Sequence, residues 1–566
     1  MSAQSPIVSK MSLVTFTIEV DGDAIDNTYQ IISIDTWNGV NKVPKARITL
    51  YDGSAAKSNF EISDNKVFIP GNKLRISAGY NSQEQEIFNG TIVKQGIEIS
   101  RDQGSRLIVD VTDAAIKMTL ERKNALFGNI KDSDLIGRLI KDNGLDDKVT
   151  ATNNVEPKIV QYYTSDWDMM MTRAQMNSFI VIVDGGTVTV QPPDTGQAAD
   201  LKVKYGDSIL DLQMDMNAAD QYSKSAIKSY SWDIGEQKVI ESGPGNVKIT
   251  EPGNISSSKL AEVFKVKNFT QQTGGPINKT SLQDWSSAEL QRSILAKIRG
   301  TVTFQGSALA KTGKTIELAG LGQRFNGTAF ISGVHHSIYS GKWLTRVEVG
   351  MSSQWFAAST PHISALDASG QLPPIKGLQT GIVKQIDKDP EGEFRVQVIM
   401  PILQDDSKAI WVRLGNFYAS NKVGAEFYPE LKDEVVIGFM NEDPRYGVIL
   451  GSLYSKKLSP PYPPDKENTK KAIKTKGELE ILFEDQDKII TTSTPGKQSI
   501  KIDDKDKSIT IADSNSNTIS MSNSGISLDS GSDIKLSAKG NINLDAKSNV
   551  MVKATSKVSV RGVSTS

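Results

Sequence analysis

Three histidines, His335, His336 and His362, are the imidazole side chains of this 566-residue sequence that could bind a transition metal. His335 and His336 are adjacent in a segment that we expect to be a strand, so their side chains point to opposite faces and cannot chelate one ion together. The sequence contains no HExxH motif and no cysteine, which removes Cys-metal sites, thiol nucleophiles and disulfides. We therefore expect structural histidines and predict no metal site.

Two further stretches invite a catalytic interpretation. The segment "GSALAKTGKT" is similar to a phosphate-binding loop, but six residues separate Gly306 from Gly313 where that motif requires four. The carboxylates of Asp503, Asp504 and Asp506 could suggest glycosidase chemistry, yet they lie in a polar segment without the apolar pocket that raises an acid's pKa. We expect them to be a solvated charge run. No GxSxG nucleophile motif occurs. We predict a protein that is not an enzyme and that has no catalytic residue and no cofactor.

The charge balance excludes a general affinity for polyanions. Lys and Arg total 65 against 66 Asp and Glu, so the overall field favours neither nucleic acid nor an anionic membrane. Residues 1–13 have no continuous apolar core of a signal peptide, and no run of about 18 apolar residues occurs anywhere. We expect synthesis in the cytoplasm without a signal peptide; export or delivery to a target cell then requires a dedicated apparatus.

Alternating apolar and polar residues dominate the first part of the chain. From Val14 to about Thr112 this pattern predicts an antiparallel β domain, and Gly185-Gly186 predicts a hairpin turn between two later strands. A helix is expected over residues 131–144, with Ser133 as its N-cap and Gly144 after its end. A second helix follows Ser165 or Asp166. The residues expected on its buried face are Trp167, Met170, Met171 and Ala174.

A third helix is predicted over residues 286–298, ended by Gly300, and more strands follow it. Two proline-rich stretches then divide the rest of the chain. "SGQLPPIKG" and "LSPPYPPDKEN" fit stiff linkers better than interior strands. About 85 residues lie between them, a size that suits one small β-barrel.

Beyond Thr475 the composition is that of a disordered polar tail, but the spacing of the apolar residues is periodic. Looser pairs at Ile500/Ile502, Ile509/Ile511 and Ile519/Met521 are followed by pairs at a strict step of eight. The strict pairs are Ile526/Leu528, Ile534/Leu536, Ile542/Leu544, Val550/Val552 and Val558/Val560. Period two within each octad, with small residues at fixed positions after it, predicts a parallel β-solenoid with one short strand per repeat.

One copy of the chain is not expected to form this solenoid alone. Burying two aliphatic side chains does not offset the entropy of ordering eight residues, and a single strand per octad leaves unpaired edges. If three copies wind around one axis, the ten apolar residues of the strict pairs meet at the centre. We therefore predict a trimeric rod whose core and trimer interface are those ten residues. A disordered polar tail is the alternative.

The segment between the linkers has a specific family resemblance. Its text, "GLQTGIVKQIDKDPEGEFRVQVIMP" followed by "WVRLGNFYASNKVGAEFYPELKDEVVIGFMNEDPRYGVILGSLY", resembles the OB-fold barrel of VgrG proteins and phage tail hub-spike complexes. The motif residues that carry the resemblance are Asp389, Pro390, Gly392, Arg395, Trp411, Arg413, Phe427, Pro429, Asp433, Glu434, Asp443, Pro444, Gly451 and Ser452. Lys432 and Phe394 depart from the pattern, because the family commonly has Gly at these two turn positions.

The resemblance extends upstream to "QYYTSDWDMMMTRAQMNSFIVIV" and "VHHSIYSGKWLTRVEVGM", which look like hub segments of the same family. It implies a mainly β homotrimer in three regions. These are a hub of two barrel-like domains with a few helices over residues 1–365, an OB-fold neck over 375–458, and a triple-stranded parallel β-helix needle over 475–566.

The function implied by the resemblance is mechanical. The protein would be the trimeric spike of a contractile injection system, such as a type VI secretion system, joining a sixfold inner tube to a membrane-puncturing needle. Expected partners are two further copies of the chain, an Hcp-like tube protein, baseplate proteins, a PAAR-like tip protein and effectors, with no nucleic acid. A trimeric phage tail fibre or surface adhesin with a solenoid stalk is the alternative function.

Overall fold

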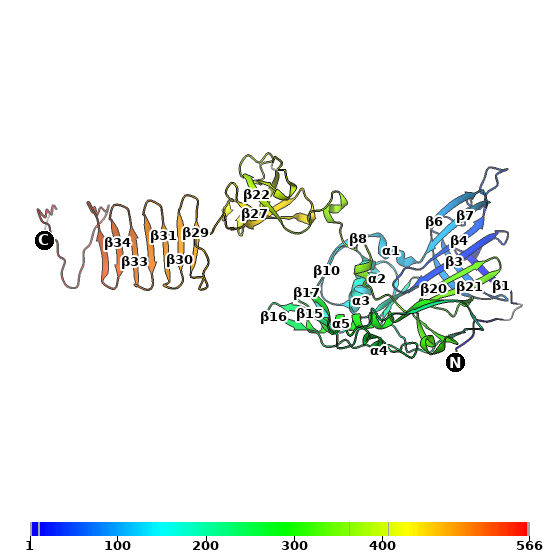
Figure 1. Cartoon of the computed structure of the whole chain (residues 1–566). Coiled ribbons are helices and arrows are strands. Elements are labelled where there is room, and N and C mark those ends of the chain that lie inside the picture. Colours follow the sequence, from blue (N-terminus) through cyan, green and yellow to red (C-terminus); the bar gives the residue numbers. More distant parts are fainter. Residues whose placement is uncertain (1–2, 9–11, 103, 362, 406, 563–566) are drawn as a thin grey trace. The chain divides into compact units, whose positions relative to one another are not determined.

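The computed structural model describes residues 3–8, 12–102, 104–361, 363–405 and 407–562. His362 and residues 563–566 of the predicted needle lie outside these ranges. The chain divides into two units, Met1–Leu366 and Asp367–Ser566, and each is described by itself. Strands dominate both units, so the prediction of a mainly β protein is confirmed (Figure 1).

The first unit is built on one sheet of thirteen strands. Its main path runs β14-β18-β21-β20-β3-β4-β7-β6-β5-β1-β2, and β13 and β19 join it beside β20. The strands are β1 (Val14–Val20), β2 (Asp23–Ala24), β3 (Ile31–Gly39), β4 (Lys45–Tyr51), β5 (Lys73–Tyr80), β6 (Gln83–Ser100), β7 (Gly104–Thr112), β13 (Leu201–Lys204), β14 (Ile209–Met216), β18 (Ile298–Gln305), β19 (Thr315–Ala319), β20 (Gly327–Tyr339) and β21 (Lys342–Val349). The antiparallel domain predicted from Val14 to Thr112 is confirmed by β1 to β7.

Two hydrophobic cores lie on this sheet, and both include residues of β20 and β21. One core contains Ile338 of β20 and Trp343 of β21 together with β1 and β3 to β7. The other contains Ile331 of β20 and Val347 of β21 together with β13, β18 and β19. The sequence predicted two barrel-like domains, whereas the structure has one continuous sheet with two cores. The difference arises because β20 and β21 are long enough for each end to face a different core.

Three small sheets and the helices complete the first unit. The small sheets contain β8 (Arg122–Lys131) with β10 (Val155–Ser165); β9 (Asp146–Val149), β11 (Ile180–Asp184) and β12 (Thr187–Gln191); and β15 (Ile227–Asp233), β16 (Lys238–Glu241) and β17 (Phe269–Thr273). The helices are η1 (Ala114–Ile116), α1 (Lys117–Leu120), α2 (Asp132–Asp142), α3 (Asp166–Met176), α4 (Ser257–Ala261), α5 (Lys279–Leu295), α6 (Gly322–Phe325) and α7 (Phe356–Ser359). A third core forms where α2 and α3 pack beside β11 and β12.

The first predicted helix exists, but its N-terminus is not capped by Ser133. α2 begins one residue earlier, and its N-cap Lys131 makes no side-chain capping bond. Instead the Ser133 N–H donates to Thr152 Oγ1 at 3.1 Å, so the cap comes from a residue distant in sequence. Gly144 has a φ of +69°, as a residue after a helix end requires.

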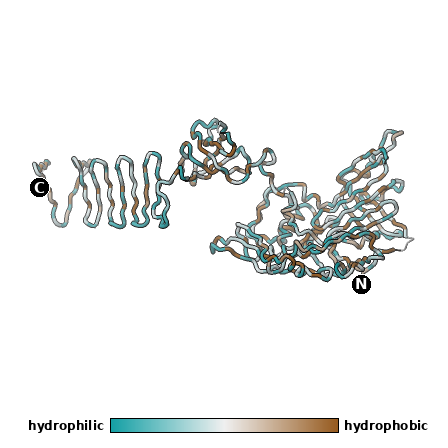
Figure 2. The backbone as a smooth tube through the Cα atoms, in the orientation of Figure 1, coloured by the Kyte–Doolittle hydropathy of each residue, from teal (hydrophilic) through white to brown (hydrophobic). Residues whose placement is uncertain are grey.

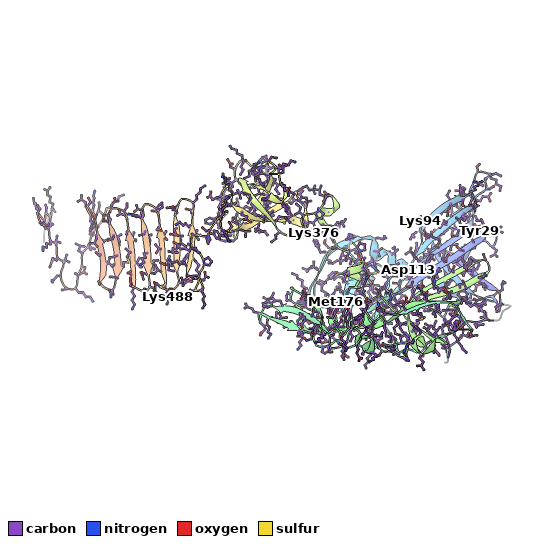
Figure 3. All side chains as sticks on the ribbon, in the orientation of Figure 1. Tyr29, Lys94, Asp113, Met176, Lys376 and Lys488 are labelled. Atoms are coloured by element: carbon purple, nitrogen blue, oxygen red, sulfur yellow. The ribbon has the colours of Figure 1, made fainter. Side chains whose placement is uncertain are left out.

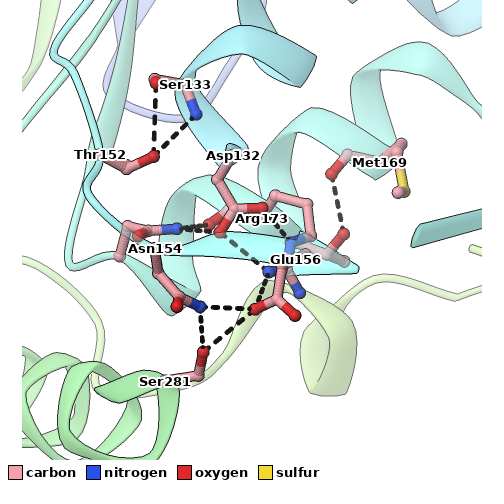
Figure 4. A network of polar contacts seen from close by, with 10 residues as sticks. Asp132, Ser133, Thr152, Asn154, Glu156, Met169, Arg173 and Ser281 are labelled. Carbon is pink, nitrogen blue, oxygen red and sulfur yellow. Dashed lines mark hydrogen bonds and ion pairs between the residues drawn. The ribbon is translucent and has the colours of Figure 1, made fainter. Parts of the chain in front are cut away.

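A polar network fixes this helix to α3 and α5 (Figure 4). Arg173 of α3 donates two hydrogen bonds to Asp132, at 2.6 and 2.8 Å, and lies 3.5 Å from Glu156. Glu156 also accepts from Asn154 and from Ser281 of α5, both at 3.0 Å. Because Asp132 is almost fully buried, these bonds satisfy a charge that would otherwise be costly to bury.

The other helix predictions have mixed outcomes. Ser165 caps α3 by accepting from the Asp168 N–H, and all four predicted residues of its buried face are buried. The third helix, α5, begins seven residues before the predicted start, at an Asn278 cap, and ends at Leu295. Gly300 does not end it, because Gly300 lies within β18.

The predicted hairpin turn at Gly185-Gly186 is confirmed, since both residues have positive φ between β11 and β12. Asp113, which is labelled in Figure 3, is buried, and its carboxylate holds this turn. It accepts the Gly186 N–H at 3.0 Å and the Ala115 N–H at 2.8 Å. Burial raises the pKa of Asp113, and its hydrogen bonds to backbone N–H groups oppose that rise.

The second unit contains a small closed barrel followed by a seven-stranded sheet. The barrel order is β22-β23-β24-β28-β27, with a core that includes Val396, Val412 and Ile437. Its elements are η2 (Asp367–Gly370), β22 (Gln379–Gln385), β23 (Val396–Ile399), η3 (Pro401–Leu403), β24 (Ile410–Leu414), β25 (Ala419–Ser420), β26 (Val423–Gly424), β27 (Glu434–Phe439), η4 (Met440–Glu442) and β28 (Gly447–Ser452). A five-stranded closed barrel agrees with the predicted OB fold.

Candidate assembly interface

The seven-stranded sheet is a meander in which each strand pairs with the next. Its strands are β29 (Lys470–Lys474), β30 (Glu480–Glu484), β31 (Ile489–Ser493), β32 (Ser499–Asp503), β33 (Ser508–Ala512), β34 (Thr518–Ser522) and β35 (Gly525–Asp529). Every pair is antiparallel, so the predicted parallel arrangement is wrong for these strands. The links between them are long enough to reverse the chain direction.

The register of this meander places apolar side chains in two columns on one face. In the first column Phe483, Ile490, Ile502, Ile509, Met521 and Ile526 are successive cross-strand partners. The second column contains Ile473, Ile481, Thr492, Ile500, Ile511, Ile519 and Leu528. We call these two columns the apolar face. Figure 2 shows apolar segments recurring on successive strands of this sheet.

The apolar face is uncovered in a single chain. Its large aliphatic and aromatic side chains are all exposed, from 36% at Ile519 to 74% at Ile526. A contiguous apolar surface of this kind marks an interaction site. The opposite face has a polar central column at Thr491, Lys501, Thr510, Ser520 and Ser527, so the sheet is amphipathic.

The predicted needle-core residues fall into two groups. Ile526 and Leu528 lie in β35 at the end of the apolar face. The other eight, Ile534, Leu536, Ile542, Leu544, Val550, Val552, Val558 and Val560, are exposed and lie in residues 530–562, which form no strand in the described structure. Sequence reasoning missed Ile473, Ile481, Phe483 and Ile490, although their period-two spacing was the signal that could have found them.

The aspartates of this region stabilise turns. The carboxylate of Asp503 is buried, lies 2.6 Å from Lys501 Nζ and accepts the Asp506 N–H, so it is not the solvated side chain we expected. Asp513 accepts N–H groups of Asn517 and Asn515, which lower its pKa to about 2. Both carboxylates therefore serve as ionised caps, and neither is held protonated as a general acid would be.

In the barrel, Asp389 organises the turn between β22 and β23. Its carboxylate accepts the N–H groups of Glu391, Glu393 and Arg395, and it receives the Arg395 guanidinium at 2.7 Å. The guanidinium contributes most, and together these donors hold the pKa of Asp389 well below its usual range. Gly392 follows with a φ of +69°. This part of the barrel motif is a structural turn.

The other barrel motif residues are dispersed. Trp411 and Arg413 lie in β24, Glu434 begins β27, and Gly451 and Ser452 end β28. Asp443 is buried and bonded to Arg445, and Asp433 accepts the Glu430 N–H. Pro429 is buried, whereas Phe427 is exposed, and Pro390 and Pro444 follow Asp389 and Asp443 in turns. The structure does not bring the described motif residues together into one pocket.

The two departures from the family pattern keep the backbone of a glycine. Lys432 has a φ of +75° and Phe394 a φ of +60°, both in the left-handed region. The Lys432 N–H donates to the Val383 carbonyl at 2.9 Å, and the Phe394 carbonyl accepts from the Tyr428 hydroxyl at 3.1 Å. The turn geometry is therefore retained although the side chain is not glycine.

The residues that the sequence offered as metal-binding or phosphate-binding candidates make contacts that stabilise the fold. His335 bonds Asp35 at 2.9 Å on one face of β20, and the fully buried His336 bonds Thr345 Oγ1 at 2.9 Å on the other. The loop-like segment after Gly306 leads into β19 at Thr315, so the helix that a phosphate-binding loop requires is not present there. Among the described residues no group of three His, Asp or Glu is arranged to hold a metal ion.

No helix in the described ranges is long and apolar enough to span a membrane.

Comparisons with known families match three parts of the chain. Residues 10–340 match the Alg8 N-terminal domain. Residues 379–454, the closed barrel, match the type VI secretion system/phage-baseplate injector OB domain. Residues 488–553, which include most of the apolar face, match the phage baseplate V C-terminal trimerisation domain.

Relatives and solved structures similar to the chain include spike and tail proteins. Over 110 residues the chain is 28% identical to the type VI secretion system spike protein VgrG5 of Pseudomonas aeruginosa, covering 18% of this chain and 14% of that one. Over 87 residues it is 31% identical to the actin cross-linking toxin VgrG1 of Vibrio cholerae, covering 14% and 8%. A prophage MuSo2 tail protein structure from Shewanella oneidensis is 10% identical, with a TM-score of 0.45, over 60% of this chain and 98% of that one.

A closed OB barrel followed by a trimerisation sheet defines a class, the structural spikes of contractile injection systems. The chain belongs to the Alg8 N-terminal domain family, whose model matches more than half of its length. Its OB and C-terminal domains make it a VgrG-type spike protein. The resemblance inferred from the barrel motif is thereby confirmed. The aligned segments span less than a sixth of either curated relative, and actin cross-linking is named for that relative only.

Proposed function

We propose that three copies of this chain assemble through the apolar face and that the assembly is the spike of a contractile injection system. The observation that carries the proposal is the apolar face itself, thirteen positions in register with almost every large side chain exposed. Three copies around one axis bury these columns against one another and leave the polar face outside. The match of residues 488–553 to a trimerisation domain supports this number of copies.

The three regions then have separate mechanical roles. Residues 1–365 form the hub that contacts an Hcp-like inner tube and baseplate proteins, and residues 375–458 form the OB neck. Residues 475–566 form the needle, whose strict octads 526–560 extend the trimeric core beyond β35 when three copies are present. The core would then include the eight apolar residues that are exposed in one chain. A rigid needle of this kind suits a part that punctures a membrane, rather than one that stabilises a transition state.

The needle end and the hub provide places for partners. A PAAR-like tip protein would cover the last strands of the needle, because an open sheet edge is otherwise a template for aggregation. Effectors would travel with the spike into the target cell. The chain leaves the producing cell as part of the apparatus.

Electron microscopy of the purified full chain tests this function. We expect particles with threefold symmetry that carry a thin projection, and we expect Hcp-like tube protein to bind the end opposite the projection. A threefold particle that binds cell-surface sugars or receptors and no tube protein would support the tail-fibre or adhesin function instead. Particles with one copy and no projection would overturn the proposal.

A further inference from the structure

Arg292 of α5 is a buried cation that forms no salt bridge among the described residues, although the charge of Glu289, three residues earlier on the helix, acts on it through space. Its exposed fraction is 9%, its Nε–H donates to the Ser353 carbonyl at 3.1 Å, and its guanidinium lies 4.8 Å from the Trp355 ring centroid. Among the residues that the structure describes, no carboxylate forms an ion pair with it. The nearest acidic side chain on its own helix, Glu289, accepts from Trp355 and Gln271 instead. Among the described residues no hydrogen bond is found from Nη1 or Nη2 of Arg292, so these two nitrogens can donate to a ligand.

The other buried cations of this unit are paired. Lys297, two residues after the end of α5, has a side chain that is 1% exposed. Its Nζ lies 2.7 Å from Glu251 Oε2 and also donates to the Pro252 and Ile255 carbonyls. Arg173 is paired with Asp132. Burying an unpaired charge costs several kcal/mol in general. Arg292 therefore departs from the pattern of its own domain, and burial lowers its pKa to about 10, which leaves it charged at neutral pH.

Arg292 lines a cavity of about 870 Å³ within the first unit. The floor is the face of the sheet at β14, β18 and β21, where Gln213, Thr301 and Glu348 are successive cross-strand neighbours. The walls are the turn after β3, the end of α3, α5, and the segment from Gly350 to Thr360. The cavity is much larger than a single carboxylate, and its lining supplies amide and hydroxyl groups that suit a peptide backbone.

The charges of the lining select among anions. The cavity is lined by three cations, Lys42, Arg292 and Arg299, and by three carboxylates, Asp215, Asp220 and Glu348, and none of these carboxylates forms a salt bridge with Arg292. Because the charges balance, the lining has no excess positive charge for a ligand with several negative charges, such as a phosphate group or a nucleic-acid backbone, and the three carboxylates repel such a ligand. One carboxylate on an otherwise neutral chain meets the planar guanidinium in the bidentate geometry that arginine favours, and it avoids the repulsion.

We propose that this cavity binds a peptide segment of another protein, with one Glu or Asp carboxylate of that segment paired with Arg292. All lining residues lie in the first unit, between Val40 and Thr360, and the proposal does not rest on the spike function. The segment lies over the sheet floor with its carboxylate toward α5.

An array of heptapeptides with a central Glu and neutral flanking residues provides the probe, and the matched array carries Gln at the centre. Full-length wild-type protein is expected to bind a subset of Glu peptides and to lose binding for their Gln counterparts. Arg292→Met is expected to weaken binding to that subset by about tenfold or more, because a charged hydrogen-bonded pair is lost. Arg292→Lys keeps the positive charge but loses the planar guanidinium that binds a carboxylate through two hydrogen bonds, so this variant is expected to bind the peptides with intermediate affinity.

Arg346→Met is the matched control, since Arg346 lies in β21 but does not line this cavity. It is expected to bind as wild type does. A competition experiment with free glutarate is the second test. Glutarate is expected to displace the bound peptide at least about tenfold more weakly than the best peptide does. Equal binding of Glu and Gln peptides, or unchanged binding by Arg292→Met with its circular dichroism intact, overturns the proposal. Glutarate competing as well as the peptide overturns the assignment to a peptide.

Discussion

Ile500 and Ile511 lie directly opposite one another on neighbouring antiparallel strands, and both side chains are more than two-fifths exposed. A cross-strand aliphatic pair stabilises a sheet most when its outer surface is also covered. The same relationship repeats between Ile502 and Ile509 and between Ile511 and Ile519. The sheet therefore has an uncovered apolar face, and we propose that further copies of the chain cover it.

A charge placed on the apolar face is expected to prevent assembly. In Ile511→Asp each chain loses the burial of one isoleucine, about 1.5–3 kcal/mol, and three carboxylates approach one another near the axis. Light scattering of the eluted protein should report single chains where wild type forms trimers.

Thr510→Asp is the control for this variant, because Thr510 is the adjacent residue on the opposite face and lies across from Lys501. A new carboxylate there faces an opposite charge, so the trimer is expected to persist. If Ile511→Asp remains trimeric, or if both variants dissociate equally, the apolar face is not the interface.

Glycine is expected to be tolerated at position 432 better than any branched residue. Lys432 has a φ of +75°, so Lys432→Gly removes left-handed strain but adds unfolded-state entropy, for a net change within about 1 kcal/mol. Lys432→Val should destabilise the barrel by more than about 1 kcal/mol, because a β-branched side chain fits this conformation poorly. Urea unfolding followed by tryptophan fluorescence measures the free energy of unfolding of both variants. A valine variant as stable as the glycine variant would contradict the assigned turn geometry.

Acid is expected to weaken the barrel through Asp389. Its native pKa lies below the unfolded value, chiefly because of Arg395, so the stabilisation is present above about pH 4 and is lost as the pH falls further. Asp389→Asn should lower the barrel's melting temperature at pH 7 and reduce its dependence on pH below 4. Asp387→Asn, an exposed neighbour, is expected to change neither property. Identical melting curves for the two variants would show that the Asp389–Arg395 pair does not hold the turn.

His336 is expected to make the first unit less stable at mildly acidic pH, the same direction of pH dependence as Asp389 gives the barrel but beginning at a higher pH. Burial, with His335 nearby, lowers the pKa of His336 to about 3. Below about pH 6.5 the unfolded chain binds a proton that the native chain excludes, so stability falls by up to about 1.4 kcal/mol per pH unit. Denaturant unfolding of His336→Gln between pH 7 and 4 should show a flatter pH dependence than wild type. His335→Gln should keep the slope, because His336 remains, and a wild-type profile that is flat over this range would contradict the burial argument.

The sequence pattern was enough to place strands and turns but not to set their direction. Ile500, Ile502, Ile509 and Ile511 alternate as a one-faced strand must, and alternation is the same for parallel and antiparallel pairing. The loop between Asp503 and Ser508 decides the direction, and its aspartate cap was read as a solvated charge run. The glycine turn at Gly185-Gly186 was predictable because its residue type defines its backbone.

Long-range contacts explain what the sequence could not reveal. Thr152 caps α2 from nineteen residues away, so the local candidate Ser133 was preferred in error. The start of α5 was hidden because its first turn is polar and its Asn278 cap lies outside the apolar pattern. The isolation of Arg292 depends on Trp355, Ser353 and Glu289 being arranged around it, and no motif encodes that arrangement.

The number of chains in the purified particle tests the central claim most directly. Light scattering of the full-length protein, combined with hydrogen exchange over residues 489–529, measures the assembly and the order of the sheet together. The account predicts three copies of the 566-residue chain and slow exchange of the backbone amides in β31 to β35. A stable single chain in which these amides exchange slowly would contradict it, because the sheet would then be complete without partners.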